Sequence, residues 1–270
     1  MKNLIITLLS IFIGINLQAQ NCNLENTAFG NNEHLKYKVY YNWKSVWAKA
    51  GYVTFDVNET ALNGSQNYHI KAIGKTYPFY NMFYKVHDVY ETYVDKTTVL
   101  PNKFVRDVNE GGFKLDHTYD FNRDNLKVHT VSKVNDHKKN IKEFDFNSCT
   151  HDMLSVIYQM RNIDFTKMKY DDEVPVEVFL DNEFYQLAMI YKGRAEVDTK
   201  FGKIKCLKVI PKVVSGRVFK EDEALTVYVS DDLNKIPVLI ESPISVGSVK
   251  AILEDFDDLR NPMTSIAEVN

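Results

Sequence analysis

The feature that most constrains the fold of this chain is an alternation of apolar and polar residues with a period of two. In residues 34–43, the apolar side chains of Leu35, Tyr37, Val39 and Tyr41 alternate with more polar ones. Successive side chains of a strand point to opposite faces, so this period is typical of a half-buried β-strand. Similar runs recur at intervals of roughly 8–12 residues, which predicts a meander of short antiparallel strands. The clearest turn signals between them are Asn63-Gly64, Gly111-Gly112, Asn135-Asp136 and Asp181-Asn182.

One stretch has a helical period instead. Leu154, Ile157 and Tyr158 recur at helical spacing, and Asp152 precedes them, where a carboxylate suits the positive end of a helix dipole. We therefore predict one main helix over residues 150–162 in a chain that is otherwise β-dominated. The expected fold is a curved antiparallel sheet of the incomplete, half β-barrel type, with the helix at its mouth.

We expect a single β-rich domain over residues 21–262, because turn signals of the same kind recur on both sides of the predicted helix. Two meanders, at about 33–147 and 173–256, flank that helix. The polar residues 21–32 read as an arm before the first strand, and residues 263–270 read as a polar tail.

The N-terminus has the pattern of a signal peptide. Lys2 supplies the positive charge, residues 4–17 form an almost unbroken apolar run, and cleavage is expected near Gln20. The run is too short for a comfortable membrane span, so we expect an exported protein, periplasmic or secreted, with no transmembrane segment in the mature chain. Cys22 follows the run, but Asn21 stands where a lipidation signal needs a small residue.

The mature chain retains three cysteines, Cys22, Cys149 and Cys206. In an oxidising compartment this odd number allows one disulfide and one free thiol. The spacing does not choose among the three pairings, and two or three buried free thiols are an equally good interpretation.

Several motifs are shared with one family of exported bacterial proteins. They are Glu33-His34-Leu35-Lys36-Tyr37, Tyr40-Tyr41-Asn42-Trp43, Ala48-Lys49-Ala50-Gly51, Gly74-Lys75-Thr76, Pro78-Phe79-Tyr80, Asp88-Val89-Tyr90-Glu91, Asp152-Met153-Leu154-Ser155 with Arg161, Thr199-Lys200-Phe201-Gly202, Cys206 with Pro211, and Ser230-Asp231-Asp232 with Ile236-Pro237-Val238. In these motifs the chain resembles the domain-of-unknown-function 3108 family. It departs from the family's usual Gly-Glu before the first strand, with Asn32 at the Gly position. The resemblance implies an exported β-rich domain with no established activity or catalytic residues.

The order of strand, acidic turn, proline and strand is also similar in pattern to the LolA/LolB-type lipoprotein carriers. Those proteins are incomplete β-barrels with a helix in the mouth and a lipid-binding cavity. A shared pattern of this kind implies a fold, and fold analogy does not transfer function.

The chemistry-bearing motifs weigh against an enzyme, a metal site or a cofactor. Gly74-Lys75-Thr76 lacks the earlier glycine and the following helix of a phosphate-binding loop, so we interpret Gly74 as relieving strain at a strand end. On a strand, His87 and Glu91 point to one face and Asp88 to the other, so the three do not share one metal ion. The formal net charge of −3 and the dispersed basic residues exclude a nucleic-acid binder.

An aromatic stretch is the best candidate for function. The candidate ligand-binding residues are Trp43, Trp47, Tyr77, Phe79, Tyr80, Phe83 and Tyr84. Aromatic side chains offer a large apolar area with polar tips that orient a ligand. The alternative is ordinary core, with Pro78 shaping a loop that plugs the sheet.

The leading hypothesis from sequence is therefore an exported envelope protein that binds or carries a lipophilic ligand on the concave face of its sheet. The alternative is a structural or interaction module of the cell envelope, whose partner would be another envelope protein. An envelope hydrolase is less favoured, because it would require His87, Glu91 or His117 to converge in a polar cleft.

Overall fold

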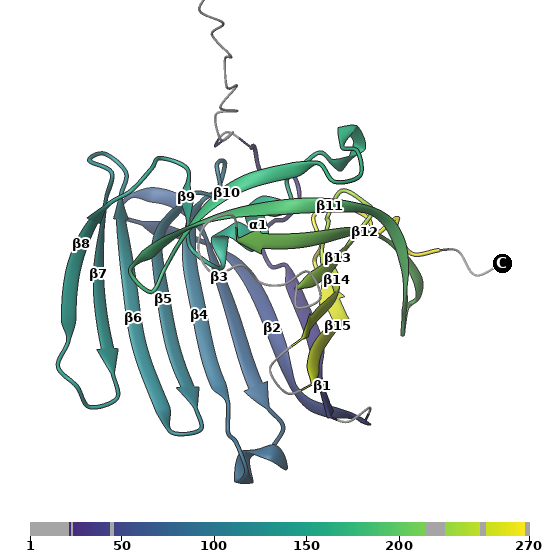
Figure 1. The fold of residues 1–270 in the computed structure, drawn as a ribbon. Helices are drawn as coiled ribbons and strands as arrows, with labels where there is room; N and C mark the ends of the chain where they lie inside the picture. Colours follow the sequence, from purple (N-terminus) through teal and green to yellow (C-terminus); the bar gives the residue numbers. More distant parts are fainter. Residues whose placement is uncertain (1–21, 23, 44–45, 214–224, 244–246, 268–270) are drawn as a thin grey trace, which may run out of the picture.

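A computed structural model describes residues 22, 24–43, 46–213, 225–243 and 247–267, with the side chains of Trp43 and Val213 outside the described part. Within these residues, fifteen strands form one sheet (Figure 1). The strands of the first half are β1 (His34–Trp43), β2 (Val46–Leu62), β3 (Ser65–Thr76), β4 (His87–Asp95), β5 (Pro101–Glu110), β6 (Phe113–Asn122), β7 (Lys127–Val134) and β8 (Asn140–Asp145). Those of the second half are β9 (Thr150–His151), β10 (Glu173–Leu180), β11 (Glu183–Thr199), β12 (Gly202–Val213), β13 (Thr226–Ser230), β14 (Pro237–Pro243) and β15 (Ser248–Asp257).

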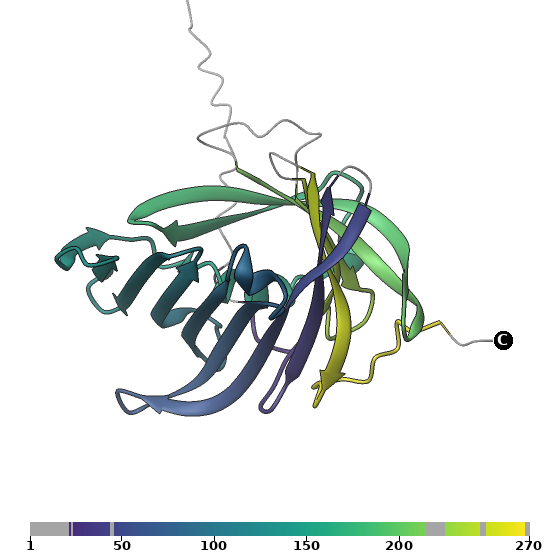
Figure 2. The same cartoon turned by 90° about the horizontal axis from the view of Figure 1, so that it is seen from below.

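The sheet consists of two meanders that meet at β1. The strand order is β8-β7-β6-β5-β4-β3-β2-β1-β15-β14-β13-β12-β11-β10-β9, so β1 pairs with both β2 and the last strand, β15. All neighbours are antiparallel except β9 and β10. The sheet curves strongly and ends at β8 and β9 without closing, as the view from below shows (Figure 2). The predicted all-β fold with a curved, half-barrel sheet and one main helix is confirmed.

The hairpin turns form where the sequence predicts them. Asn63 and Gly64 have φ values of 52° and 83°, and Asp181 and Asn182 have φ values of 52° and 64°. These are left-handed conformations, which Asn, Asp and Gly adopt more readily than other residues. Asn32 has a φ of 67°, which explains why a glycine or an asparagine suits the position just before β1.

The main helix is shorter than predicted. Helix α1 spans only Ser155–Met160, and Thr150 and His151 form β9 instead. The Asp152 carboxylate accepts hydrogen bonds from the backbone N–H groups of Leu154 (2.7 Å) and Ser155 (2.8 Å), which starts the helix at this point. The Thr150 hydroxyl donates to Glu177 rather than capping the helix. Two short 3₁₀ turns, η1 (Tyr80–Met82) and η2 (Phe165–Lys167), complete the elements. No helix among the described residues is long and apolar enough to cross a membrane.

The segment before β1 is core rather than a loose polar arm, so that expectation is wrong. Ala28 and Phe29 are fully buried on the inner face of the sheet. The Phe29 ring lies 5.5 Å from that of Tyr68 on β3 and 4.8 Å from that of Tyr158 on α1. Two apolar residues are too few to show a period, which is why the alternation pattern missed them.

A second core cluster closes the junction of the two meanders. Leu35 and Tyr37 of β1 pack with Ile204 of β12 and Leu253 of β15, and all four are at most 2% exposed. Part of the expected polar tail lies against this cluster, because Ile266 forms a β-bridge with Ile204.

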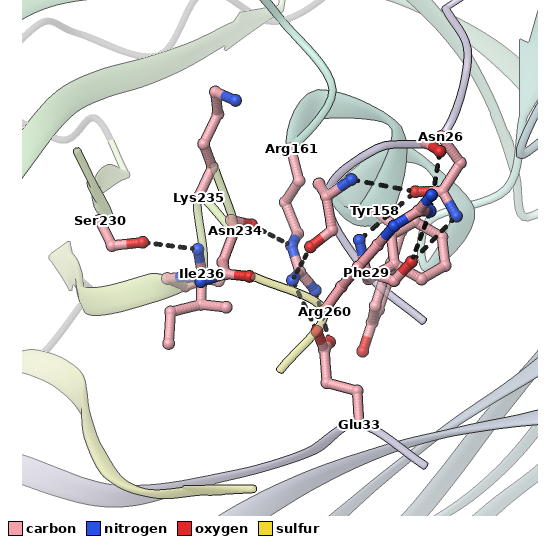
Figure 3. A network of polar contacts seen from close by, with 12 residues as sticks. Asn26, Phe29, Glu33, Tyr158, Arg161, Ser230, Asn234, Lys235, Ile236 and Arg260 are labelled. Carbon is pink, nitrogen blue, oxygen red and sulfur yellow. Dashed lines mark hydrogen bonds and ion pairs between the residues drawn. The ribbon is translucent and has the colours of Figure 1, made fainter. Parts of the chain in front are cut away.

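A buried ion pair joins α1 to the segment before β1 (Figure 3). The Arg161 guanidinium donates to both carboxylate oxygens of Glu33, at 2.6 and 2.8 Å, and the two side chains are 2% and 0% exposed. Arg161 also donates from Nε to the Asn234 carbonyl (2.9 Å) and from Nη2 to the Ala28 carbonyl (3.3 Å). Its guanidinium carbon lies 5.0 Å from the centre of the Tyr158 ring.

Asn234 extends this network to the second meander. Its side chain donates to the Asn261 carbonyl (2.8 Å) and accepts from the Asn261 N–H (2.9 Å). Arg260 donates to the carbonyls of Asn26 (2.9 Å) and Phe29 (3.3 Å). The helix end, the N-terminal segment, the β13–β14 turn and the segment after β15 are therefore held by one set of polar contacts.

A disulfide joins Cys22 to Cys149, and Cys206 is a buried free thiol. Of the alternatives left open by the spacing, the structure has one disulfide and one free thiol. The bond ties the N-terminal segment to the residues just before β9.

Removing the disulfide with Cys22→Ser and Cys149→Ser should lower the free energy of unfolding by about 2–5 kcal/mol, because it closes a long loop. The sequence separation of the two cysteines is 127 residues. Urea unfolding with and without reductant measures the effect. Reductant should destabilise the wild type and leave the double variant unchanged, whereas an equal wild-type midpoint in both conditions would contradict the expectation.

Arg161→Met should lower the free energy of unfolding by about 3–5 kcal/mol, because it leaves the Glu33 carboxylate buried without its counter-ion. Adding Glu33→Gln should recover part of this loss in a double-mutant cycle. The exposed pair Lys203–Glu196 provides the control, since Lys203→Met should cost less than about 1 kcal/mol. Equal losses of unfolding free energy in Arg161→Met and Lys203→Met would show that burial does not make the Arg161–Glu33 pair more important for stability.

Candidate functional site

A cavity of about 400 Å³ lies on the inner face of the sheet. Strands β1 to β4 form its wall, and α1 and the residue pair before it cover one side. Its lining is almost entirely apolar. The apolar side chains that carry this character are Val39, Val53, Phe55, Met153, Leu154 and Ile157.

Two glycines shape the cavity for different reasons. A Cβ on Gly51 would come within 2.2 Å of the Lys75 carbonyl oxygen, so the close approach of β2 and β3 requires a glycine there. A Cβ on Gly74 would meet only Val53, at 3.9 Å, and the Gly74 backbone is not in the left-handed region. The interpretation that Gly74 relieves strain is therefore wrong. Its effect is to leave space on the inner face.

The cavity has one acidic end. Asp88 of β4 is 6% exposed, lines the cavity and accepts a hydrogen bond from the Asn109 N–H (2.9 Å). Burial and, to a smaller extent, the Asp88 carboxyl raise the pKa of the nearby Glu110 side chain. Burial also raises the pKa of Tyr90 to about 12, so this phenol stays protonated beside Asp88. The apolar cavity thus ends at two neighbouring carboxyl groups and a hydroxyl.

The tip of the β10–β11 hairpin covers the inner face next to this end. Arg106 forms an ion pair with Asp181 at the tip. The Asp181 N–H donates to the Tyr119 hydroxyl oxygen (3.1 Å), and Thr130 donates to the Asn182 side-chain oxygen (2.8 Å). The two left-handed turn residues therefore also anchor the hairpin across the sheet.

Two buried nitrogens in this region are unpartnered within the described part of the chain, Nε of Arg106 and Nε2 of His117. Burial and, to a smaller extent, the positive charge of Arg106 lower the pKa of His117 to about 4. The sequence analysis named His117 only as a residue that a hydrolase would require, and it did not single out Arg106. His117 is therefore neutral at physiological pH.

The predicted aromatic residues do not form a core. Phe79 and Phe83 are 69% and 75% exposed, on the loop between β3 and β4. Tyr80 lies against Phe79, with ring centres 5.3 Å apart, and Tyr84 lies over Gly111 of the β5–β6 turn. The interpretation of this stretch as a plug of the sheet is therefore wrong.

The two ends of this loop reach the cavity, because Thr76 and Val86 line it. Tyr77 itself lies on the outer face of the sheet, where its ring is 5.9 Å from that of Tyr52, whose cross-strand partners are Lys38 and Lys75. Trp47 lies on the same outer face, with its ring 4.2 Å from the Lys250 ammonium. The side chain of Trp43 lies outside the described residues. The structure therefore separates both Tyr77 and Trp47 from the cavity.

The residues that a hydrolase would need do not converge. Glu91 pairs with His69 (2.8 Å) and Lys71 (3.1 Å) on the outer face of the sheet. His87 is on the same face as Glu91, four residues earlier on β4, whereas His117 faces inward. Within the described ranges, no group of three or more His, Cys, Asp or Glu residues could hold a metal ion.

A second, wider hollow of about 780 Å³ lies between α1 and β10, beside the disulfide. Its wall mixes charged residues such as Asp164 and Glu173 with apolar ones such as Met160 and Val176. Deep pockets for lipophilic molecules are predominantly apolar with few polar groups, so the smaller cavity is the better candidate.

Stability should fall in acid because His117 is buried in its neutral form. The unfolded chain protonates this residue near pH 6.5 and the folded protein only near pH 4. The stabilisation is therefore complete above pH 6.5 and is lost as the pH falls from 6.5 through about 4, by about 2–3 kcal/mol. His117→Gln should flatten this part of the curve in urea unfolding measured between pH 7 and 4. His137→Gln, on an exposed turn, is the control, and an unchanged slope for His117→Gln would refute the assignment.

One solved structure of similar fold agrees with this architecture. A β-barrel-like protein of the DUF1849 domain-of-unknown-function family from Brucella abortus is similar in fold, with a TM-score of 0.56 and 13% identity over 85% of this chain and 99% of that one. A protein with a YmcC-like fold from Bacteroides fragilis matches with a TM-score of 0.34 and 11% identity, over 86% of this chain and 100% of that one. No curated protein matches the sequence significantly. The family model of the proteins of unknown function DUF3108 matches residues 36–254, and the chain therefore belongs to this family.

Proposed function

We propose that this protein is an exported binder or carrier of a lipophilic ligand, whose apolar part occupies the cavity beneath α1. The observation that carries the proposal is that cavity, about 400 Å³ in volume and walled by apolar side chains of β1 to β4 and α1. Its size lies in the range of roughly 300–1,000 Å³ that is common for small-molecule pockets.

The acidic end of the cavity gives the ligand an orientation. Asp88 lies at the wall, and the pKa of Glu110 is raised first by partial burial and then by the neighbouring Asp88 carboxyl. A ligand with a hydroxyl, amide or amine group at this end would donate a hydrogen bond to the carboxylate. An anionic head group would be repelled, so we propose an uncharged or cationic polar group on an apolar body.

Two features support export to an oxidising compartment. The N-terminal residues have the charge and apolar run of a signal peptide. The Cys22–Cys149 disulfide is of the kind that persists outside the reducing cytosol.

Filling the cavity tests the proposal. Gly74→Leu places a side chain on the inner face, where a Cβ has ordinary contact distances, and it should leave the fold intact. Lipid extracted from the protein purified from its native host should be identifiable by mass spectrometry. Binding of a neutral fluorescent lipid analogue should weaken at least about tenfold in Gly74→Leu, because the added side chain takes up volume that the ligand needs.

Thr54→Leu is the control, because it places the same leucine side chain on the outer face of β2, away from the cavity. It should bind the analogue as the wild type does. Failure of the wild type to bind the analogue or to carry extractable lipid would overturn the proposal. So would equal binding by the wild type and a folded Gly74→Leu variant.

A further inference from the structure

We propose that the end of the sheet at the cavity mouth docks onto the surface of an anionic lipid bilayer. The docking element is the loop between β3 and β4, residues 77–84, which we call the aromatic loop. This inference concerns a surface rather than the cavity, and it goes beyond ligand binding.

The aromatic loop exposes large apolar side chains. Phe79, Met82 and Phe83 are 69%, 78% and 75% exposed, and Tyr84 is 53% exposed. Within η1, the described residues include no buried side chain. Exposed apolar residues are common singly, but several on one loop mark an interaction surface.

Other apolar side chains lie at the same end of the sheet. In an antiparallel meander, the β1–β2, β3–β4 and β5–β6 connections all fall on one edge, the lower one in Figure 1. Trp47 and Phe113, 41% and 44% exposed, follow the first and third of these connections. Figure 2 looks onto this edge from below. The aromatic loop is thus the most prominent part of an apolar rim.

Positive charge surrounds the aromatic loop. Lys49, Lys75, Lys85 and Lys114 lie on the same edge, and none forms an ion pair with another described residue. Farther along β3, β5 and β7, by contrast, the lysines are paired. Those pairs are Lys71 with Glu91, Lys103 with Asp120, and Lys127 with Glu143 and Asp145. Exposed carboxylates near this edge are Asp107, Asp116 and Asp136, and Asp88 and Glu110 lie at the same edge facing the cavity.

This combination of residues is complementary to an anionic bilayer. Aromatic side chains and Met enter the boundary between head groups and acyl chains, while nearby lysines attract anionic lipids. A second copy of this chain would oppose like charges across the same rim, which disfavours a homodimer there. The whole chain has a net charge of −3, so the unpaired lysines beside the aromatic loop are a local feature of this edge.

The aromatic loop is held in place rather than loose. Thr76 donates from its hydroxyl to the Asn81 side chain (2.7 Å), and the Val86 N–H donates back to the same hydroxyl oxygen (3.0 Å). The Gly111 N–H donates to the Lys85 carbonyl (2.8 Å), which ties the loop to the β5–β6 turn. Because the loop is preorganised, little conformational entropy is lost on docking. Thr76 and Val86, which line the cavity at the two ends of the loop, would then lie close to the lipid surface.

Vesicle sedimentation with the chain expressed from Asn21 tests the docking. The wild type should sediment with vesicles of phosphatidylglycerol and phosphatidylcholine, and less with phosphatidylcholine alone. Phe79→Ser with Phe83→Ser should lower the partition coefficient by about tenfold or more, because two large apolar side chains no longer enter the bilayer. Lys85→Glu with Lys114→Glu, or high salt, should lower binding only to the anionic vesicles.

Tyr170→Ser with Leu233→Ser is the matched control. These side chains are 66% and 65% exposed, close to the values for the aromatic loop, and they lie away from the rim. The control should bind vesicles as the wild type does. Absence of wild-type binding, or equal loss in the two double variants, would overturn the proposal. Self-association or capture of another envelope protein that depends on Phe79 and Phe83, without vesicle binding, would also overturn it.

Binding of the neutral lipid analogue in solution separates this inference from the proposed function. The variant with Phe79→Ser and Phe83→Ser should retain analogue binding, since neither side chain lines the cavity. Gly74→Leu should retain vesicle binding. If Gly74→Leu loses vesicle binding together with analogue binding, the bilayer contact is made through the cavity contents and the docking proposal fails.

Discussion

The buried pair between Arg161 and Glu33 is the interaction on which the arrangement of the inner face depends. A buried charge needs an opposite charge beside it, and here the two terminal guanidinium nitrogens each donate to one carboxylate oxygen. The match fixes α1 against the segment before β1 and, through Asn234, against the β13–β14 turn. The helix is only six residues long and would have little stability alone. Its position over the sheet is therefore set by polar contacts at its end and by the packing of Tyr158 on Phe29.

The position of the helix determines what space remains on the concave face. One part of that face is filled by Phe29, Tyr158 and their neighbours. The adjacent part, over β2 to β4, carries Gly74 and Ala72 and is left open under Leu154 and Ile157. The concave face is thus neither wholly filled nor wholly empty, and the boundary between the two parts lies at α1.

Sequence periodicity was a good guide to the strands and turns and a poor guide to isolated contacts. Alternation and the Asn-Gly and Asp-Asn turns predicted the meanders, because they reflect local backbone geometry. Burial of Phe29 and the partnership of Arg161 with Glu33 depend on pairs 128 or more residues apart in the chain, and no local pattern encodes them. Composition identified the aromatic loop but not its exposure, since aromatic residues are equally frequent in cores and on binding surfaces. Gly74 illustrates the same limit, because only the structure distinguishes a glycine that relieves strain from one that leaves space.

The pairing of β1 with β15 has a consequence for how the chain acquires its structure. The first strand has one neighbour close in sequence, β2, and another, β15, that lies more than 200 residues later. Strand β1 therefore lacks its second neighbour until β15 is present. Contacts between residues so far apart in sequence slow folding. A chain of this topology therefore remains open at β1 while its C-terminal part is missing. Because β15 covers one edge of β1, a protein shortened at its C-terminus would expose that edge to pairing with strands of other molecules.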